Sequence, residues 1–126
     1  MIVIDTDIVI EYLKGNEKII KAVNEYSKNS DIGITYISKY ELRKYSDKTN
    51  KLLEELIKNI TVLYPDITSA SRSAEIFRRL RSAGNLINEN DILIAGIALG
   101  NNNKFITLDS DFNKINDMNI SVLELS

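Results

Sequence analysis

Residues 2–14 read IVIDTDIVIEYLK, and this stretch joins two different patterns of hydrophobic residues. The first four residues are an apolar run that ends at Asp5, which is typical of a strand buried on both faces of a parallel sheet. From about residue 7 the apolar side chains recur at helical spacing, until Gly15 ends the helix. The stretch therefore predicts a buried strand that leads straight into a helix, with Asp5 and Asp7 at the junction.

The same alternation continues along the chain, since short apolar runs predict strands and amphipathic segments predict helices between them. The expected strands are residues 2–5, 32–35, 60–63, 104–108 and 120–123. The expected helices are residues 7–14, 17–27, 37–45, 50–58, 68–82 and 91–99, with a short turn and helix at 109–115. Alternating strands and helices predict an α/β fold with a mainly parallel sheet of about five strands, in one domain over residues 1–126.

Composition excludes several kinds of chemistry. The 126 residues include no cysteine and no histidine, so disulfides, thiolate zinc sites and histidine catalysis are all excluded. A net charge of −2 gives no overall basic field for nucleic acid. We find neither a signal-peptide pattern nor an apolar run near the ~20 residues of a membrane span. The sequence therefore predicts a soluble, cytoplasmic protein.

Acidic residues lie where the expected strands end. Asp5 ends the first strand, Asp109 and Asp111 follow the fourth, Glu41 lies beyond the second, and Asp91 opens the apolar helix before the fourth. Ligands of open α/β sheets bind at this carboxyl edge. Converging carboxylates repel one another unless their pKa values rise or a cation gathers them. An all-oxygen set suits Mg²⁺ or Mn²⁺ and metal-assisted phosphoryl chemistry.

Each of these residues also has a purely structural interpretation. Asp7 is as well placed to cap the helix as to serve a site. Asp91 is an ordinary first-turn acid if Asn88 or Asn90 caps its helix. Glu41, taken alone, resembles an exposed helix glutamate. These alternatives remain open from the residues themselves.

Four segments in order resemble the PIN-domain ribonucleases, especially the toxin component of Vap-type toxin–antitoxin pairs. They are IDTDIVIEYLKG (4–15), ITYISKYEL (34–42), NDILIAGIAL (90–99) and FITLDSDF (105–112). Each motif is weak alone, but together they span essentially the whole chain. The resemblance implies a three-layer α/β/α domain with Mg²⁺- or Mn²⁺-dependent endonuclease activity on RNA. It also implies a homodimer that is bound by a cognate antitoxin.

The resemblance also implies roles for individual residues. The catalytic and metal-binding acids would be Asp5, Glu41, Asp91 and Asp109. Asp111 would be a further metal ligand, and Thr107, Asp7 and Thr6 would support the site. Spacing from Thr107 favours Asp109 as the fourth acid. Asp111 falls in the first turn of the next helix, where it can cap that helix or meet its dipole.

Arginines cluster in SRSAEIFRRLRSAG, residues 71–84. They are Arg72, Arg78, Arg79 and Arg81. A solvated helix face is the plainest interpretation. The alternatives are an edge that binds RNA phosphates, or a surface that faces an acidic antitoxin segment.

Two other protein families also have aspartates directly after a first strand, and they suggest alternative functions. Asp5, Asp7 and Val9 fit D-x-D-x-[TV], the signature of haloacid-dehalogenase-like phosphatases, in which Asp5 would be a nucleophile. The chain is short for that fold and imitates its late acidic motif only loosely. A receiver domain would need an aspartate directly after the third strand, whereas Asp66 lies past Pro65. A PIN-like binding module without catalysis is the remaining alternative.

Overall fold

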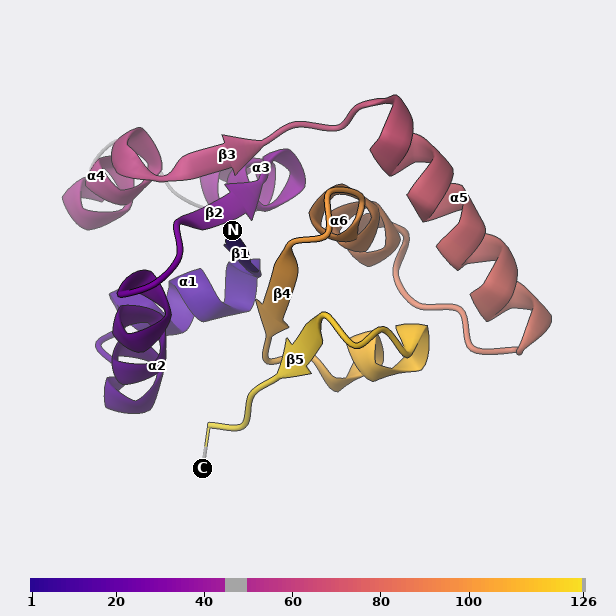
Figure 1. Cartoon of the computed structure of the whole chain (residues 1–126). Helices are drawn as coiled ribbons and strands as arrows, with labels where there is room; N and C mark the ends of the chain where they lie inside the picture. The colour runs from indigo at the N-terminus through magenta and orange to yellow at the C-terminus, as the bar shows by residue number, and fades with distance from the viewer. Residues whose placement is uncertain (45–49, 126) are drawn as a thin grey trace.

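One parallel sheet forms the centre of the molecule. The computed structural model describes residues 1–44 and 50–125, and its five strands pair in the order β3-β2-β1-β4-β5 with every pairing parallel (Figure 1). The strands are β1 (Ile2–Ile4), β2 (Ile32–Thr35), β3 (Thr61–Leu63), β4 (Lys104–Thr107) and β5 (Ile120–Val122). The predicted α/β fold with a mainly parallel sheet is confirmed.

Helices connect successive strands. They are α1 (Thr6–Leu13), α2 (Glu17–Ser27), α3 (Tyr36–Lys44), α4 (Lys51–Asn59), α5 (Ile67–Ser82), α6 (Glu89–Leu99) and the 3₁₀ helix η1 (Ser110–Ile115). The predicted bounds of α2 and β2 are confirmed without change. Helix α6 begins two residues before its predicted start, because the Asn88 side chain caps it by accepting the Asn90 N–H. Residue 45, the predicted end of the third helix, lies outside the described residues.

Both faces of the sheet are covered, and the central strand shows why its sequence is apolar throughout. Val3 packs in a core with residues of α5, α6 and η1. Ile2 and Ile4 point to the other face, into a second core built with α1, α2 and α4. Figure 1 shows α1 and α2 on one side of the strands and α5 and α6 on the other. The result is the expected three-layer α/β/α arrangement.

Strand order decides which side chains meet at the carboxyl edge. Strand β1 lies between β2 and β4, with Ile4 opposite Ile106 in the register of the β1–β4 pair. Asp5 therefore leaves the sheet at its centre, between the ends of its two neighbours. Thr35 ends β2 on one side, and Thr107 ends β4 on the other.

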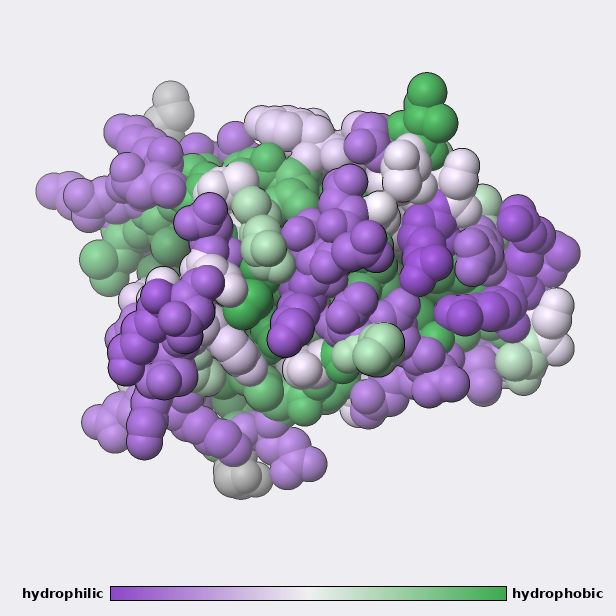
Figure 2. Space-filling view, viewed as in Figure 1, coloured by the Kyte–Doolittle hydropathy of each residue, from purple (hydrophilic) through white to green (hydrophobic). Residues whose placement is uncertain are grey.

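The outer helical faces carry most of the polar side chains. Figure 2 shows that hydrophilic residues cover much of one face of the molecule, with hydrophobic residues visible between them and at a few protruding positions. Within residues 1–44 and 50–125, none of the helices combines the length and the apolar character that crossing a membrane requires.

Helices α5 and α6 approach each other closely at a glycine. A Cβ on Gly96 would overlap the Ser73 hydroxyl and lie 2.9 Å from the Ser69 carbonyl oxygen. The Ser73 hydroxyl also donates a hydrogen bond to the Ile92 carbonyl of α6 (3.2 Å). This contact fixes the position of α6, and with it the direction in which its N-terminus points.

We predict that Gly96→Ala destabilises the protein. Alanine favours a helix over glycine by about 1 kcal/mol, but overpacking a close contact typically costs about 1–3 kcal/mol. Here the added methyl group would overlap the Ser73 side chain and the Ser69 backbone carbonyl. Urea unfolding should therefore show a net loss of stability. The Ser73→Ala background should reduce that loss, because it removes the overlapping hydroxyl. Equal losses in both backgrounds would contradict this account of the packing.

Candidate active site

Asp5 is a buried carboxylate with two hydrogen-bond donors. Its side chain is 5% exposed, and it caps α1 by accepting the Thr6 N–H at Oδ1 (2.8 Å). Its other oxygen, Oδ2, accepts the Thr107 hydroxyl (2.7 Å). The sequence left open whether Asp7 caps this helix, and the structure gives that role to Asp5.

Thr107 contacts acidic residues of two segments from a fully buried position. Its hydroxyl donates to Asp5 and accepts the Asp109 N–H (3.1 Å). Asp7 lies beside it, with Oδ2 3.4 Å from the same hydroxyl, and both Asp7 oxygens lie 3.2 Å from the Leu108 nitrogen, which donates to them. The first acidic segment is therefore tied to the end of β4.

Glu41 reaches the same edge from α3. That helix starts directly after β2, where the Thr35 hydroxyl accepts the Ser38 N–H (3.1 Å). The Thr6 hydroxyl donates to Glu41 Oε1 (2.7 Å), although the two residues are 35 positions apart in sequence. The family resemblance implied only a supporting role for Thr6, and its hydroxyl holds the Glu41 carboxylate.

Asp91 interacts electrostatically with most of the other acids. It lies in the first turn of α6, behind the cap residue Asn88. Burial, and then the negative charges of four other acids, together raise the pKa of Asp91 to about 6. Those acids, in decreasing order of effect, are Asp109, Glu41, Asp111 and Asp7.

Burial and repulsion also act on the first acidic segment. Burial, and then the charge of Asp7, raise the pKa of Asp5 to about 7, against the opposing effect of its hydrogen bonds to Thr107 and Thr6. Burial likewise raises the pKa of Asp7. The five acids that the sequence places at this edge therefore interact electrostatically with one another and with Asp7. They are Asp5, Glu41, Asp91, Asp109 and Asp111.

The two late aspartates have different roles at the start of η1. Asp109 caps η1, because its side chain accepts the Asp111 N–H (2.9 Å). Asp111 lies in the first turn, as expected, but its side chain is half exposed and pairs with Lys114 (3.5 Å). The sequence left open whether Asp111 caps η1 or meets its dipole, and the cap is Asp109, whose backbone has the extended conformation that a cap residue needs.

Comparison with known proteins agrees with this geometry. The family model described as "PIN domain" matches residues 2–118, nearly the whole chain. The chain belongs to the PIN-domain family. The haloacid-dehalogenase and receiver-domain alternatives are therefore wrong.

Relatives of this PIN domain include a curated ribonuclease and chains from solved complexes. Ribonuclease VapC3 of Methanocaldococcus jannaschii is 30% identical over 95 residues, which cover 75% of this chain and 95% of the relative. A chain in the structure of VapBC-1 from nontypeable Haemophilus influenzae is 28% identical, with a TM-score of 0.82 and coverage of 97% and 98% of the two chains.

A chain of Rickettsia felis VapBC2, solved with a promoter DNA fragment, has the same TM-score of 0.82 at 22% identity. It covers 98% of both chains. At this identity the likeness supports the fold alone.

The donor set of this PIN domain fits a hard divalent cation. All its candidate ligands are carboxylates, and the burial and repulsion that raise the pKa values of Asp5 and Asp91 are what a cation would offset. Within the part of the chain that the structure describes, however, no three acidic side chains are close enough to hold one ion together. One or two of these carboxylates, with waters as the remaining ligands, are a usual set for Mg²⁺.

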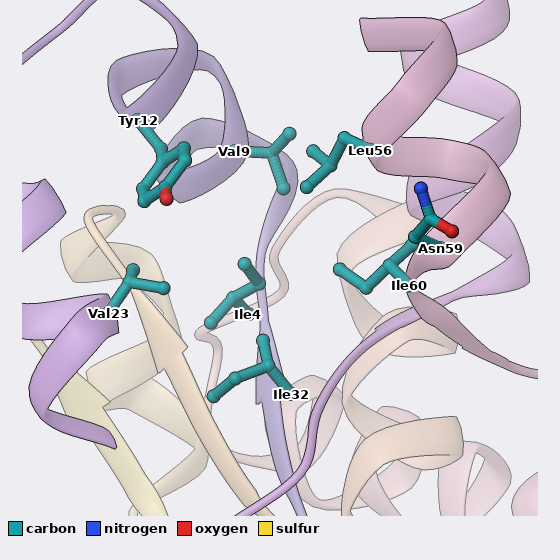
Figure 3. A pocket seen from close by; sticks show the side chains of 8 residues that line it. All are labelled: Ile4, Val9, Tyr12, Val23, Ile32, Leu56, Asn59 and Ile60. Carbon is teal, nitrogen blue, oxygen red and sulfur yellow. The ribbon is translucent and has the colours of Figure 1, made fainter. Parts of the chain in front are cut away.

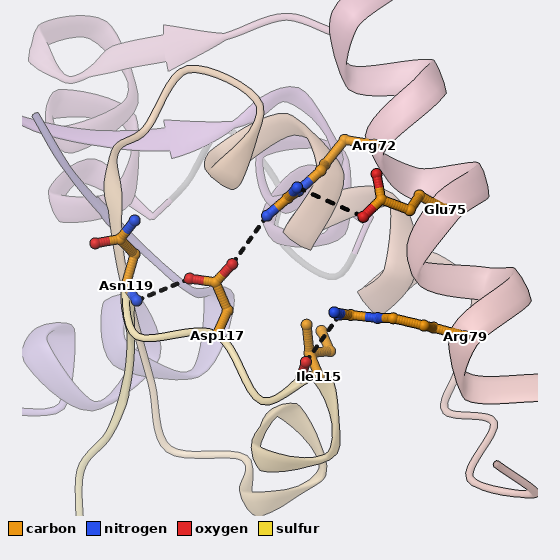
Figure 4. Close-up of polar contacts among 6 residues, drawn as sticks. All are labelled: Arg72, Glu75, Arg79, Ile115, Asp117 and Asn119. Atoms are coloured by element: carbon orange, nitrogen blue, oxygen red, sulfur yellow. Dashed lines mark hydrogen bonds and ion pairs between the residues drawn. The ribbon is translucent and has the colours of Figure 1, made fainter.

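Two of the four arginines on α5 bind within the chain (Figure 4). Arg72 donates to Asp117 (2.9 Å), whose other oxygen accepts the Asn119 N–H, and Arg79 donates to the Ile115 carbonyl (2.9 Å). These bonds hold the end of η1 and the turn before β5 against α5. That Arg72 or Arg79 contacts RNA or an antitoxin stays a prediction. Either arginine would have to make that contact while it keeps its hydrogen bond within the chain.

The other two arginines of this helix are exposed. The Arg81 guanidinium lies over the Phe77 ring, 5.4 Å from its centroid. Arg78 lines a shallow hollow together with Arg79. Both side chains are accessible to a partner. Arg78 and Arg81 can therefore still belong to a solvated helix face, to an edge that binds RNA phosphates or to a surface that faces an antitoxin.

An apolar cavity of about 230 Å³ lies between α1, α2 and α4 (Figure 3). Its walls include Val9 and Tyr12 of α1, Val23 of α2 and Leu56 of α4. None of its lining residues is one of the clustered acids. This cavity is therefore separate from the candidate active site.

We predict that the metal-free protein loses stability as the pH rises from about 4 to about 7. In this range folded Asp5 holds a proton that the unfolded chain, with an ordinary value near 3.8, has lost, so raising the pH favours unfolding. At about 1.4 kcal/mol for each pH unit, Asp5 accounts for at most about 4 kcal/mol. Asp5→Asn should make the fall shallower and leave the protein at least as stable as the wild type at pH 7.

Urea unfolding in EDTA across this pH range measures the effect. Asp31→Asn is the matched control, because Asp31 is exposed, and it should keep the steeper pH dependence of the wild type. If Asp5→Asn unfolds the protein at every pH, Asp5 is primarily structural.

Proposed function

We propose that this PIN domain, as one unit over residues 1–126, is a metal-dependent endoribonuclease that acts as the toxin of a toxin–antitoxin pair. The observation that carries the proposal is the electrostatic coupling of Asp91 to acids from three other segments of the chain. Four segments distant in sequence thus contribute carboxylates to one edge of the sheet, which is where α/β folds bind ligands. The relationship to Ribonuclease VapC3 supports RNA as the substrate.

The proposed metal ligands are Asp5, Glu41, Asp91 and Asp109, with Asp111 as an additional one. Mg²⁺ or Mn²⁺, when bound, supplies a Lewis acid that activates water and neutralises charge on the phosphodiester. The remaining residues act through the carboxylates that they hold. Thr107 and the Thr6 N–H fix Asp5, the Thr6 hydroxyl fixes Glu41, and the Leu108 N–H fixes Asp7.

We extend the proposal to the partners of the protein. The 28% identical chain of VapBC-1 supports a cognate antitoxin as a binding partner. The resemblance to Vap-type toxins favours a homodimer, and action on RNA implies a cytoplasmic protein. A PIN-like binding module without catalysis is the alternative that the following experiments exclude or establish.

We predict that the purified protein cleaves RNA in Mg²⁺ or Mn²⁺ and is inactive in EDTA. The reason is that carboxylates alone provide no group that both activates water and neutralises a phosphodiester near neutral pH. Gel assays of end-labelled RNA, with activity restored by adding each metal back, measure the dependence. Cleavage that survives thorough chelation would exclude the metal mechanism, and its absence with every divalent metal would favour the binding module.

Substitutions of Asp109 should separate its two roles. Asparagine caps helices as well as aspartate does, so Asp109→Asn should keep the thermal stability while it lowers RNA cleavage by orders of magnitude. Asp109→Ala should lose both cleavage and stability, the latter on the order of 1 kcal/mol. Asp111→Ala is the matched comparison, and we expect only a modest loss of cleavage from it. If Asp111→Ala is inactive and Asp109→Asn is active, Asp111 is the fourth ligand.

A further inference from the structure

The short 3₁₀ helix η1 carries the last acids of the cluster, and its position depends on its neighbours. It has six residues, and 3₁₀ helices longer than about four residues are uncommon because their hydrogen-bond geometry is poor. Its buried side chains, Phe112 and Ile115, pack in one core with Ile76 and Leu80 of α5. The long helix α5 is therefore the support of η1.

Polar bonds from α5 fix the far end of η1 (Figure 4). Arg79 donates to the Ile115 carbonyl (2.9 Å). Arg72 donates to Asp117 (2.9 Å), which lies just past the end of η1. The other Asp117 oxygen accepts the Asn119 N–H (2.8 Å), so this carboxylate also closes the turn before β5. These bonds hold the C-terminal end of η1 against α5.

The Arg72–Asp117 pair fixes a geometry at some cost in stability. The Asp117 side chain is only 14% exposed, so its charge has lost most of its contact with water. The Nε atom of Arg72 is buried, and within residues 1–44 and 50–125 it has no hydrogen-bond partner. A buried donor without an acceptor is unfavourable. A partly buried ion pair is weak evidence for stability, and one use of such pairs is to fix a single arrangement of the chain.

The near end of η1 is Asp109, which is held from two sides. Its N–H donates to the buried Thr107 hydroxyl, and its carboxylate accepts the Asp111 N–H in the first turn of η1. The backbone of Asp109 thus follows β4, but the direction of its carboxylate follows η1. Among the charges that act on Asp91, that of Asp109 has the largest effect on its pKa. A small shift of η1 therefore changes how Asp109 faces the other acids.

We propose that Arg72 and Asp117 are positioning residues of the active site, which hold η1 in the position that directs the Asp109 carboxylate toward the other acids. The inference rests on the proposed metal-dependent function and adds two residues to it. Their contacts lie at the far end of η1, so they act on metal binding through Asp109. Replacing a side chain that orients a metal ligand commonly lowers metal affinity about 10–100-fold, and for a contact this remote we expect about three- to tenfold.

Mn²⁺ binding to the protein without RNA tests the proposal, with the free ion measured by electron paramagnetic resonance. Arg72→Met keeps the apolar stem of the side chain and removes its charge and its donors. Loss of a positive charge alone would tighten the binding of a cation. We expect the opposite, a Kd for Mn²⁺ that is about three- to tenfold higher. Arg72→Lys keeps a donor for Asp117 and should recover part of the affinity. Tighter or unchanged binding in Arg72→Met would overturn the proposal.

Asp117→Asn and Glu75→Gln form a matched pair. Each removes one negative charge and one ion-pair partner of Arg72, since Glu75 lies 3.8 Å from that arginine. Asparagine can still accept the Asn119 N–H, so the turn before β5 is kept. Asp117→Asn should weaken Mn²⁺ binding about three- to tenfold, and Glu75→Gln should leave it unchanged. Equal effects of the two substitutions contradict a positioning role.

A double-mutant cycle with Asp109 separates positioning from loss of stability. If Arg72 acts through the Asp109 carboxylate, Arg72→Met should have little further effect on Mn²⁺ binding once Asp109→Asn is present. Thermal melting without metal gives the loss of stability, which should be the same in both backgrounds. A full effect of Arg72→Met on Mn²⁺ binding in the Asp109→Asn background would exclude the proposal. If Arg72→Met does not fold, Asp117→Asn takes its place in the cycle.

The failure of this inference is distinguishable from failure of the proposed function. If the wild type binds no Mn²⁺ and cleaves no RNA with any metal, the metal-dependent function is wrong. If the wild type binds Mn²⁺ and cleaves RNA, and Arg72→Met binds the ion as tightly, only the positioning role is wrong.

Discussion

The hydrogen bond from the Thr107 hydroxyl to the Asp5 carboxylate links the end of β4 to the end of the central strand β1, at the edge where the acids gather. Both residues are buried, and a buried carboxylate without donors would be costly to the fold. Thr107 also accepts the Asp109 N–H, so one hydroxyl sets the positions of the first and last acidic segments. The remaining contacts at this edge build on that arrangement.

Two further contacts bring the other acids to the same place. The Thr6 hydroxyl, one residue beyond Asp5, fixes Glu41 from α3. Asp91 depends on helix packing instead, because the glycine contact between α5 and α6 sets where the N-terminus of α6 lies. The site thus combines hydrogen bonds near the strand ends with close packing on one face of the sheet.

The acidic cluster favours function at some expense of stability. Burial and mutual repulsion raise the pKa values of Asp5, Asp7 and Asp91, so deprotonated carboxylates destabilise the metal-free fold. Groups with perturbed pKa values are common at functional sites, because burial and like charges there adjust the pKa of a group to its chemical task. A purely structural role would more readily be filled by neutral hydrogen-bonding side chains.

Much of the fold could be predicted because it depends on local patterns. The apolar run before Asp5 indicated a strand buried on both faces, and the bounds of α2 and β2 followed from periodicity and turn residues. The expectation that acids gather at one edge followed from the rule that parallel strands end there, but a role for Glu41 came only from the resemblance to a family motif. Thr107 was named only through its resemblance to a family motif.

The sequence by itself determined the α/β class and the strand and helix segments, and it indicated that several acids lie near the carboxyl edge of the sheet. Only the tertiary structure decided that Asp5 and Asp109 cap their helices, because capping depends on the backbone angles of the cap residue. It also decided that Arg72 binds Asp117, 45 residues away, and that Thr6 binds Glu41. Such partners are brought together by chain packing, and no local pattern of residues specifies them.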